Sequence, residues 1–332
     1  MSIGKVLVLK GKFIGMAVGK IPLIINADPG IDDAMAIVLA LASEKLDVKL
    51  LASSAGNLSI DIVTRNCLHL IEKMGKKVPV ARGAVNSMYK NRENFAYVHG
   101  DGGFGTYVPT APTSKELPQE AFEEMYNVLK KSRKKVTILS LGPLTNLAKL
   151  LTKYPDSKHK IEEIVFMGST KEEENIYNPR NNNKTVYASS NVNYDPVATE
   201  IIISSGVKVV FVPSEMGHNA YLDLEDIKQV SQFGEIGKML HKMFETYKDG
   251  HVDRKMGVAT HDSCALAYIL DPKLFKEENV SCNMNWYNKG KDGVLFCDII
   301  TGNIESIHKM CVDIDDLGFK KLVFEILRGI EN

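Results

Sequence analysis

The chain has 332 residues, 44% hydrophobic and 25% charged, which is enough apolar material for a large buried core. Lysine plus arginine and aspartate plus glutamate both number 41, and this zero net charge favours neither nucleic acid nor an anionic membrane surface as a partner. No apolar run approaches the roughly 18 residues that a membrane-spanning helix needs, so we expect no membrane partner.

Short apolar, β-branched runs alternate with helical patterns along most of the chain. Strands are expected over 21–26, 48–57, 78–83, 134–142, 161–169 and 207–215, and helices over 32–43, 60–74, 144–152 and 195–205. Because these strands are continuous apolar runs, the fold class predicted is α/β, with a mostly parallel, doubly wound sheet. Runs at 280–287, 294–300 and 306–314 predict a small C-terminal antiparallel annex, followed by a helix over 316–330.

Two long polar stretches, 83–118 and 171–193, interrupt this alternation of strands and helices. Loops of such length are usually functional or disordered. No linker divides the chain. We therefore expect a single domain over 21–332, preceded by an N-terminal extension, 1–20, that lacks the continuous apolar core of a signal peptide. Five cysteines without a CxxC pair favour a reduced compartment and a cytoplasmic location.

An acidic segment, NADPGIDDAMAI at 26–37, follows the first predicted strand. A structural explanation is that Asp32 is a helix N-cap and Asp33 lies in the first turn of the helix. This leaves Asp28, on the other side of a Pro-Gly turn, unexplained. Three carboxylates in one crevice repel one another unless a cation or a shared proton relieves them, and ligands of open α/β sheets bind at the carboxyl ends of strands. The segment therefore favours a functional cluster.

Further motifs follow in a fixed order: AGN at 55–57, VHGDGGFG at 98–105, SLGPLTNLA at 140–148, FMG at 166–168, NVNYDP at 191–196 and HDSCALAY at 261–268. Together with NADPGIDDA, and over nearly the whole chain after residue 20, these blocks resemble the calcium-dependent inosine–uridine-preferring nucleoside hydrolases. The first block is highly specific, whereas GPLTN and HD are modest individually.

The resemblance implies a Ca²⁺ site. Calcium prefers six to eight hard oxygen ligands, so carboxylates and carbonyls must converge on one point. By resemblance, the protein ligands are Asp28, Asp33, Asp262 and the main-chain carbonyl of Leu141. Without the resemblance, Leu141 is a plain strand-end residue, and Asp262 is as readily a helix N-cap.

The resemblance also implies catalytic and substrate-binding residues. Asp28 is expected to take a proton from the attacking water, and His261 to assist departure of the base. Contacts to the nucleoside are expected from Asp32, which would hold the ribose diol, and from Asn57, His99, Met167, Asn183 and Asn191. Structural alternatives stand beside these roles: asparagine is common in turns, a lone histidine is more often structural than catalytic, and Asn178 could serve in place of Asn183.

Two positions depart from the family pattern. Asn26 stands where the family usually has aspartate, and Ser189 stands where it has a ribose-binding glutamate. The first change removes a charge. The second replaces a carboxylate with a short hydroxyl, which weakens the expected ribose contact unless a glutamate of 172–174 replaces it.

The function predicted is hydrolysis of the N-glycosidic bond of a ribonucleoside by a calcium-dependent homodimer or homotetramer, giving ribose and free base. Two alternatives remain: a degenerate calcium or nucleoside-binding protein, and a phosphatase of the haloacid-dehalogenase type, which needs an aspartate nucleophile at position 26. The sequence does not name the base, although a single tryptophan, Trp286, argues against a double-tryptophan base sandwich.

Overall fold

The structure is a computed structural model that describes residues 19–89, 96–169, 175–177, 184–186, 189–247, 257–286, 294–299 and 306–330. The predicted N-terminal extension therefore lies almost entirely outside the described residues. Its boundary at residue 20 stays a prediction, although the first strand does begin at Ile21.

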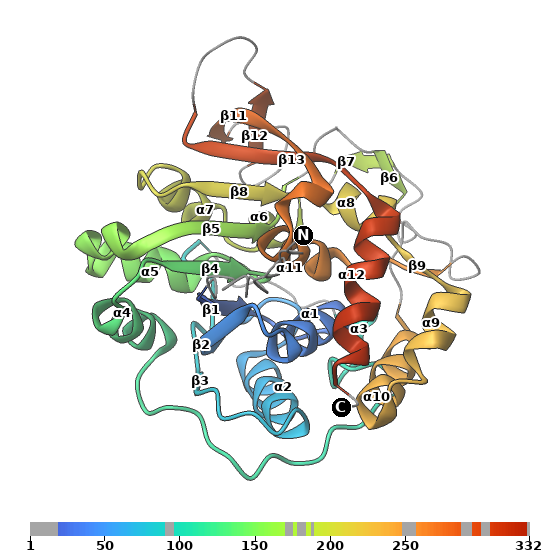
Figure 1. The fold of residues 1–332 in the computed structure, drawn as a ribbon. Coiled ribbons are helices and arrows are strands. Elements are labelled where there is room, and N and C mark those ends of the chain that lie inside the picture. The colour runs from blue at the N-terminus through green and yellow to red at the C-terminus, as the bar shows by residue number, and fades with distance from the viewer. Residues whose placement is uncertain are drawn as a thin grey trace, which may run out of the picture.

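A nine-stranded sheet forms the centre of the molecule (Figure 1). From one edge to the other its strands are β12 (Val294–Ile299), β11 (Phe275–Asn285), β13 (His308–Ile314), β8 (Val209–Val212), β5 (Ile161–Met167), β4 (Val136–Ser140), β1 (Ile21–Ala27), β2 (Leu46–Ser53) and β3 (Val80–Ala81). All neighbouring pairs from β13 to β3 are parallel, whereas β11 pairs antiparallel with both β12 and β13. The mostly parallel sheet and its antiparallel C-terminal strands are thus confirmed, and the annex continues the main sheet.

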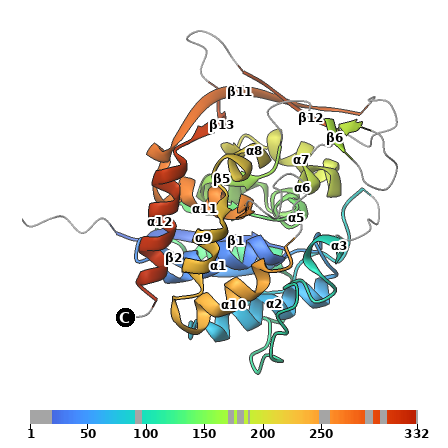
Figure 2. The same cartoon turned by 90° about the vertical axis from the view of Figure 1, so that its right-hand side faces the viewer.

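Helices cover both faces of the sheet, because successive side chains of each central strand point to opposite faces. On β1, Leu23 and Ile25 belong to one core and Ile24 to the other. The first core is completed by α1 (Ile31–Ala42), α2 (Ile60–Lys73), α8 (Ser214–Asn219), α9 (Leu224–Val230), α10 (Gly234–Phe244), α11 (His261–Leu270) and α12 (Asp316–Arg328). The second is completed by α4 (Ala121–Lys131), α5 (Thr145–Lys153) and α7 (Pro196–Ile203). Figure 2 shows α9, α10 and α12 in front of the strands.

Short elements occupy the two predicted loops. The first contains α3 (Ala96–His99), and the second contains the hairpin β6 (Asn175–Tyr177) and β7 (Lys184–Val186), followed by α6 (Ser190–Tyr194). Elsewhere, β9 (Leu222–Asp223) pairs with β10 (Gly257–Val258), and two 3-10 turns cover Pro155–Lys160 and Pro272–Leu274. No helix within the described ranges combines the length and the apolar character needed to cross a membrane.

The fold aligns the carboxyl ends of four central strands at one edge of the sheet. The register places Asn26 of β1 beside Ser140 of β4, Ser140 beside Phe166 of β5, and Met167 beside Val212 of β8. The segments that follow these strands therefore lie together, as parallel pairing requires. Most of the predicted site residues belong to these segments or to the first turns of α1 and α11.

The two-sided core predicts a large difference between two leucine substitutions on helices. Leu150 of α5 is fully buried in the second core, whereas Leu317 of α12 is 73% exposed. We expect Leu150→Ala to lower the free energy of unfolding by about 2–5 kcal/mol, and Leu317→Ala to change it by less than about 0.5 kcal/mol. Urea denaturation of both variants measures this, and equal losses would contradict the described packing.

Candidate active site and metal centre

Asp33 closes the turn between β1 and α1. Its Oδ2 accepts a hydrogen bond from the Gly30 N–H at 3.0 Å, and its Oδ1 accepts one from the Asp28 N–H at 3.3 Å. The N-cap of α1 is Gly30, so the structural explanation that made Asp32 the N-cap is wrong. Asp33 therefore has a structural role in the turn that joins β1 to α1.

The carboxylate of Asp28 is held between two backbone segments. It is 1% exposed, and its Oδ2 accepts the Asn57 N–H at 2.6 Å. A Cβ on Gly56 would lie 2.1 Å from Oδ2, and a Cβ on Gly142 would lie 2.3 Å from Oδ1, so only glycine fits at either position. Oδ1 itself is buried and has no hydrogen-bond partner.

Asn57 lies against the same turn. Its Nδ2 donates to the Asp28 carbonyl at 3.2 Å and to Asp33 Oδ2 at 3.1 Å. The side chain and the main chain of Asn57 thus fix both carboxylates from one side. In this structure the amide is engaged in positioning the acidic residues.

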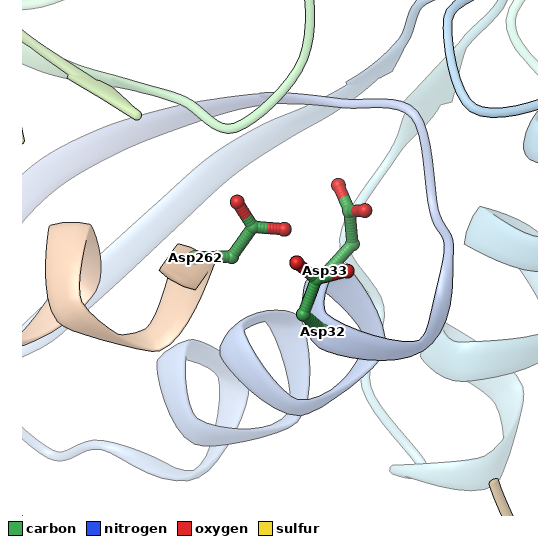
Figure 3. A group of neighbouring side chains, drawn as sticks. All are labelled: Asp32, Asp33 and Asp262. Atoms are coloured by element: carbon green, nitrogen blue, oxygen red, sulfur yellow. The ribbon is translucent and has the colours of Figure 1, made fainter. Parts of the chain in front are cut away.

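Three carboxylates, from Asp32, Asp33 and Asp262, offer ligand oxygens within 4.8 Å of one another (Figure 3). The first two come from α1 and the third from the first turn of α11, where Thr260 and not Asp262 is the N-cap. The structure thus brings Asp262 to Asp33, as the resemblance implies, and this closest trio contains Asp32 in place of Asp28. A buried oxygen of Asp32, like Asp28 Oδ1, has no hydrogen-bond partner. Crowded, unpartnered carboxylate oxygens fit a hard divalent cation.

The crowding changes the acidity of the cluster. Burial, followed by repulsion from Asp33, raises the pKa of Asp28 well above its ordinary value. Burial, followed by repulsion from Asp32, raises the pKa of Asp33 to about 7. Burial, followed by repulsion from Asp33, also raises the pKa of Asp262 well above its ordinary value. These carboxyl groups therefore tend to stay protonated near neutral pH unless a bound cation supplies positive charge that favours their ionised form.

Asn191 joins the ends of β4 and β5. Its Nδ2 donates to the Leu141 carbonyl at 2.5 Å and to the Met167 carbonyl at 2.9 Å, and lies 3.6 Å from Met167 Sδ. A carbonyl oxygen has two lone pairs, so this bond leaves Leu141 able to bind a cation as well. Three of the predicted site residues are therefore neighbours here.

His261 is the first residue of α11, and its ring lies against α8. Its Nδ1 is 3.0 Å from the Ser214 carbonyl, so Nδ1 carries a proton and donates. The ring meets His218 edge to face, with centroids 4.9 Å apart, and a Cβ on Gly217 would lie 2.3 Å from Nδ1. The Nδ1–H of His261 is thus engaged by the main chain of α8.

His99 lies at the amino end of α1 and is 5% exposed. Its Nδ1 accepts the Ile31 N–H at 3.2 Å, so a neutral ring carries its proton on Nε2. The ring stacks on Tyr247 with centroids 5.7 Å apart, and Nδ1 lies 4.0 Å from Asp32 Oδ1. Asn66 of α2 joins the acidic turn to the Gly-rich block that contains His99, because its Nδ2 donates to the carbonyls of Pro29 and Gly102, each at 3.0 Å.

The remaining predicted residues are of two kinds. Asn183, its substitute Asn178 and the glutamates of 172–174 lie outside the described residues. Ser189 is 6% exposed and is the N-cap of α6, without a side-chain capping bond.

Sequence reasoning missed two buried polar residues that connect the site's segments. Asn146 Nδ2 donates to the Ser53 carbonyl at 2.9 Å, and Asp195 Oδ2 accepts from the Met88 N–H at 2.7 Å and from Thr145 Oγ1 at 2.6 Å. Both belong to the quoted blocks GPLTN and NYDP. A polar residue within such a block, beside a predicted helix start, was the available signal.

Comparison with known proteins agrees with this geometry. Residues 23–321 match the family model described as inosine-uridine preferring nucleoside hydrolase. The chain belongs to this family. It is 31% identical over 310 residues to the non-specific ribonucleoside hydrolase RihC of Escherichia fergusonii, covering 93% of this chain and 98% of that relative, and matches RihC of Escherichia coli strain K12 to the same extent. Family membership removes the haloacid-dehalogenase alternative.

Solved structures of nucleoside hydrolases share the fold. A plant nucleoside hydrolase, PpNRh1, superposes with a TM-score of 0.82 at 27% identity, over 92% of this chain and 98% of that one. A purine-preferring ribonucleoside hydrolase from Gardnerella vaginalis superposes with a TM-score of 0.83 at 24% identity, over 93% and 99% of the two chains. The second likeness supports the fold alone.

The raised pKa values predict how the stability of the metal-free protein depends on pH. For Asp28, Asp33 and Asp262 the folded-state pKa lies above the ordinary 3.8, so the folded protein binds more protons than the unfolded chain. This stabilisation is fully present below 3.8 and is lost as the pH rises through about 7 for Asp33. Chelator-treated protein should therefore lose at least about 1.4 kcal/mol of unfolding free energy, the equivalent of one pKa unit, as the pH rises through this window.

Urea denaturation at a series of pH values measures this loss. Saturating calcium should reduce it, because a bound cation stabilises the ionised carboxylates. The same pH dependence with chelator and with calcium would contradict a metal at this cluster.

Proposed function

We propose that this nucleoside hydrolase family member cleaves the N-glycosidic bond of ribonucleosides with water, giving ribose and a free base. The family match and the names of the similar ribonucleoside hydrolases support the reaction class. The observation that carries the proposal is the buried, unpartnered Oδ1 of Asp28 beside the Asp32–Asp33–Asp262 cluster. An oxygen of this kind can accept a proton from a water molecule.

Asp28 is proposed as the general base. The Asn57 N–H fixes Oδ2, which leaves Oδ1 as the atom that receives the proton. Burial raises the pKa of this carboxyl, and a more basic carboxylate removes a proton from water more readily once it is ionised. The close backbones of Gly56 and Gly142 keep the oxygen in place for the reaction.

Calcium is the proposed cation. Asp28, Asp33, Asp262 and the Leu141 carbonyl would hold it, and Asp32 lies close enough to these carboxylates to contribute to the same cluster. When bound, the ion supplies positive charge that orients a water molecule and the ribose hydroxyls. The raised pKa values of the cluster support a cation as its natural counter-charge.

The other predicted residues would contact the nucleoside. Asp32 is proposed to accept hydrogen bonds from the ribose diol, with Asn57, His99, Met167, Asn183 and Asn191 around the substrate. The bond to the base breaks through an oxocarbenium-like state and its electron pair leaves with the base, so the departing base needs a proton. His261 is proposed to give that proton from Nε2, because its Nδ1 proton is engaged by the Ser214 carbonyl.

A panel of nucleosides assayed for reducing-sugar release tests the proposal. The purified full chain should release ribose from inosine, uridine or a related ribonucleoside in calcium, and the rate should fall after chelation. Binding of nucleoside and calcium without any ribose release would instead establish the binding-protein alternative. The base preference is read from the same panel, whereas the expected homodimer or homotetramer and the cytoplasmic location stay predictions.

Replacing the proposed base should remove turnover without unfolding the protein. Asp28→Asn keeps an oxygen for the Asn57 N–H and relieves a repulsive cluster, so we expect the fold to be retained. The turnover number should fall by about 100- to 10,000-fold, the usual contribution of a general base. Asp47→Asn, at a partly exposed ion pair with Lys49, is the control and should keep the parent rate. Full activity in Asp28→Asn would exclude Asp28 as the base.

The role of His261 predicts a dependence on the leaving group. His261→Ala should lower kcat/KM for inosine and uridine by about 100-fold or more, because their bases leave poorly without a proton. It should change kcat/KM for a nitrophenyl riboside by less than about tenfold, since nitrophenolate leaves unprotonated. Equal losses on both substrates would assign His261 to binding or folding.

A further inference from the structure

The side chain of Asn26 is fully buried at the end of β1, two residues before Asp28. Its Nδ2 donates to Ser140 Oγ and to the Pro143 carbonyl, each at 3.0 Å, and its Oδ1 accepts from Asn146 Nδ2 at 2.9 Å. Its main-chain carbonyl accepts the Leu141 N–H at 2.8 Å. The same carbonyl accepts the Gly142 N–H at 3.4 Å. Asn26 therefore binds the segment 140–146 at five points.

The orientation of the Asn26 amide is determined by its surroundings. The Pro143 carbonyl can only accept a hydrogen bond, so a nitrogen must face it. At the other end, Asn146 Oδ1 accepts the Ala84 N–H at 2.9 Å and Asn146 Nδ2 donates to the Ser53 carbonyl, so Asn146 must present a donor to Asn26. Ser140 in turn donates its hydroxyl proton to the Gly142 carbonyl at 3.0 Å. An amide satisfies all of these groups.

A carboxylate in the same place does not. An ionised aspartate has acceptors only, so one of its oxygens would face the Pro143 carbonyl without a proton between them. It would also add a charge close to the four buried carboxylates of Asp28, Asp32, Asp33 and Asp262. Buried acceptors left without donors are costly, so the segment 140–146 would have to move or the new carboxyl would have to take up a proton.

The segment that Asn26 holds is the one that meets the candidate active site. Leu141 supplies the carbonyl proposed to bind calcium, and Gly142 lies against Asp28 Oδ1. We propose that Asn26 is a positioning residue, whose amide fixes 140–146 against Asp28, and that this chain requires an amide at a position where its family usually has an aspartate. The link to calcium rests on the proposed function, whereas the fixing of the segment does not.

Asn26→Asp, which restores the usual family residue, tests the proposal. Hydrogen exchange followed by mass spectrometry reports on the segment directly, because the Leu141 and Gly142 N–H groups both donate to the Asn26 carbonyl. In metal-free Asn26→Asp we expect these amides to exchange about tenfold faster, equivalent to about 1.4 kcal/mol. Calorimetric titration with calcium should show a dissociation constant about tenfold higher than that of the parent protein.

Tyr268→Phe is the matched control. It removes a hydrogen bond of 2.6 Å from the Tyr268 hydroxyl to Glu277, on the part of α11 remote from Asp262, and should change neither the exchange at 140–146 nor the calcium affinity. If Asn26→Asp does not fold, Ser140→Ala replaces it. That variant removes one acceptor of Asn26 without adding charge, and the exchange at 141–142 should still accelerate by about threefold.

The outcomes separate the two proposals. Parent-like exchange at 141–142 in Asn26→Asp, or in Ser140→Ala where that variant replaces it, would overturn the positioning role, as would equal acceleration in Tyr268→Phe. Tighter calcium binding by Asn26→Asp would also overturn it, because added charge would then matter more than the amide's bonds. If the parent protein binds no calcium, the proposed metal fails, and the exchange experiment alone decides the role of Asn26.

Discussion

Four aspartates share one buried crevice. Burying and crowding their carboxylates is unfavourable, and the structure around them supplies groups that offset this free energy. Asp28, Asp32, Asp33 and Asp262 are each at most 8% exposed, and burial is the largest cause of the raised pKa of Asp28, Asp33 and Asp262. The fold supplies part of the compensation: the N–H groups of Gly30 and Asn57 face these carboxylates, at the positive end of the α1 dipole. The remainder has to come from protons or from a cation.

Asparagine side chains make many of the hydrogen bonds that connect the segments around the four carboxylates. Asn57 ties β2's end to the acidic turn, Asn66 ties that turn to the Gly-rich loop, and Asn191 ties β4 to β5. Asn146 donates both to Asn26 of β1 and to the Ser53 carbonyl of β2, and so connects these strands to the segment after β4. An amide can both donate and accept without adding charge, which suits a crevice that already holds four carboxylates. Asn26 thus adds hydrogen bonds to this crevice without adding a charge.

The sequence predicted the sheet, the order of its main elements and the acidic residues, because these features are local. Apolar runs mark β1, β4 and β5, and the specific NADPGIDDA block marks Asp28 and Asp33. Side-chain contacts between distant segments were not predictable in this way: Asn26 and Asn146 are 120 positions apart, and their bond follows only from the strand order. The start of β11 at Phe275 was not predicted because FKEEN carries charged residues on the strand. Helix α10 was not predicted either, and α8 and α9, with six and seven residues, are too short to show a clear helical period.

The two glycines beside Asp28 determine when the side chain of Asp28 loses its conformational entropy. A carboxylate enclosed by the backbones of Gly56 and Gly142 has almost no torsional freedom left, so its conformational entropy is lost when the chain folds and not when a substrate binds. Folding free energy thus fixes in advance the oxygen that we propose as the base. A longer acidic side chain at position 28 would meet these two glycine backbones, so Asp28→Glu would have to move the segments that follow β2 and β4.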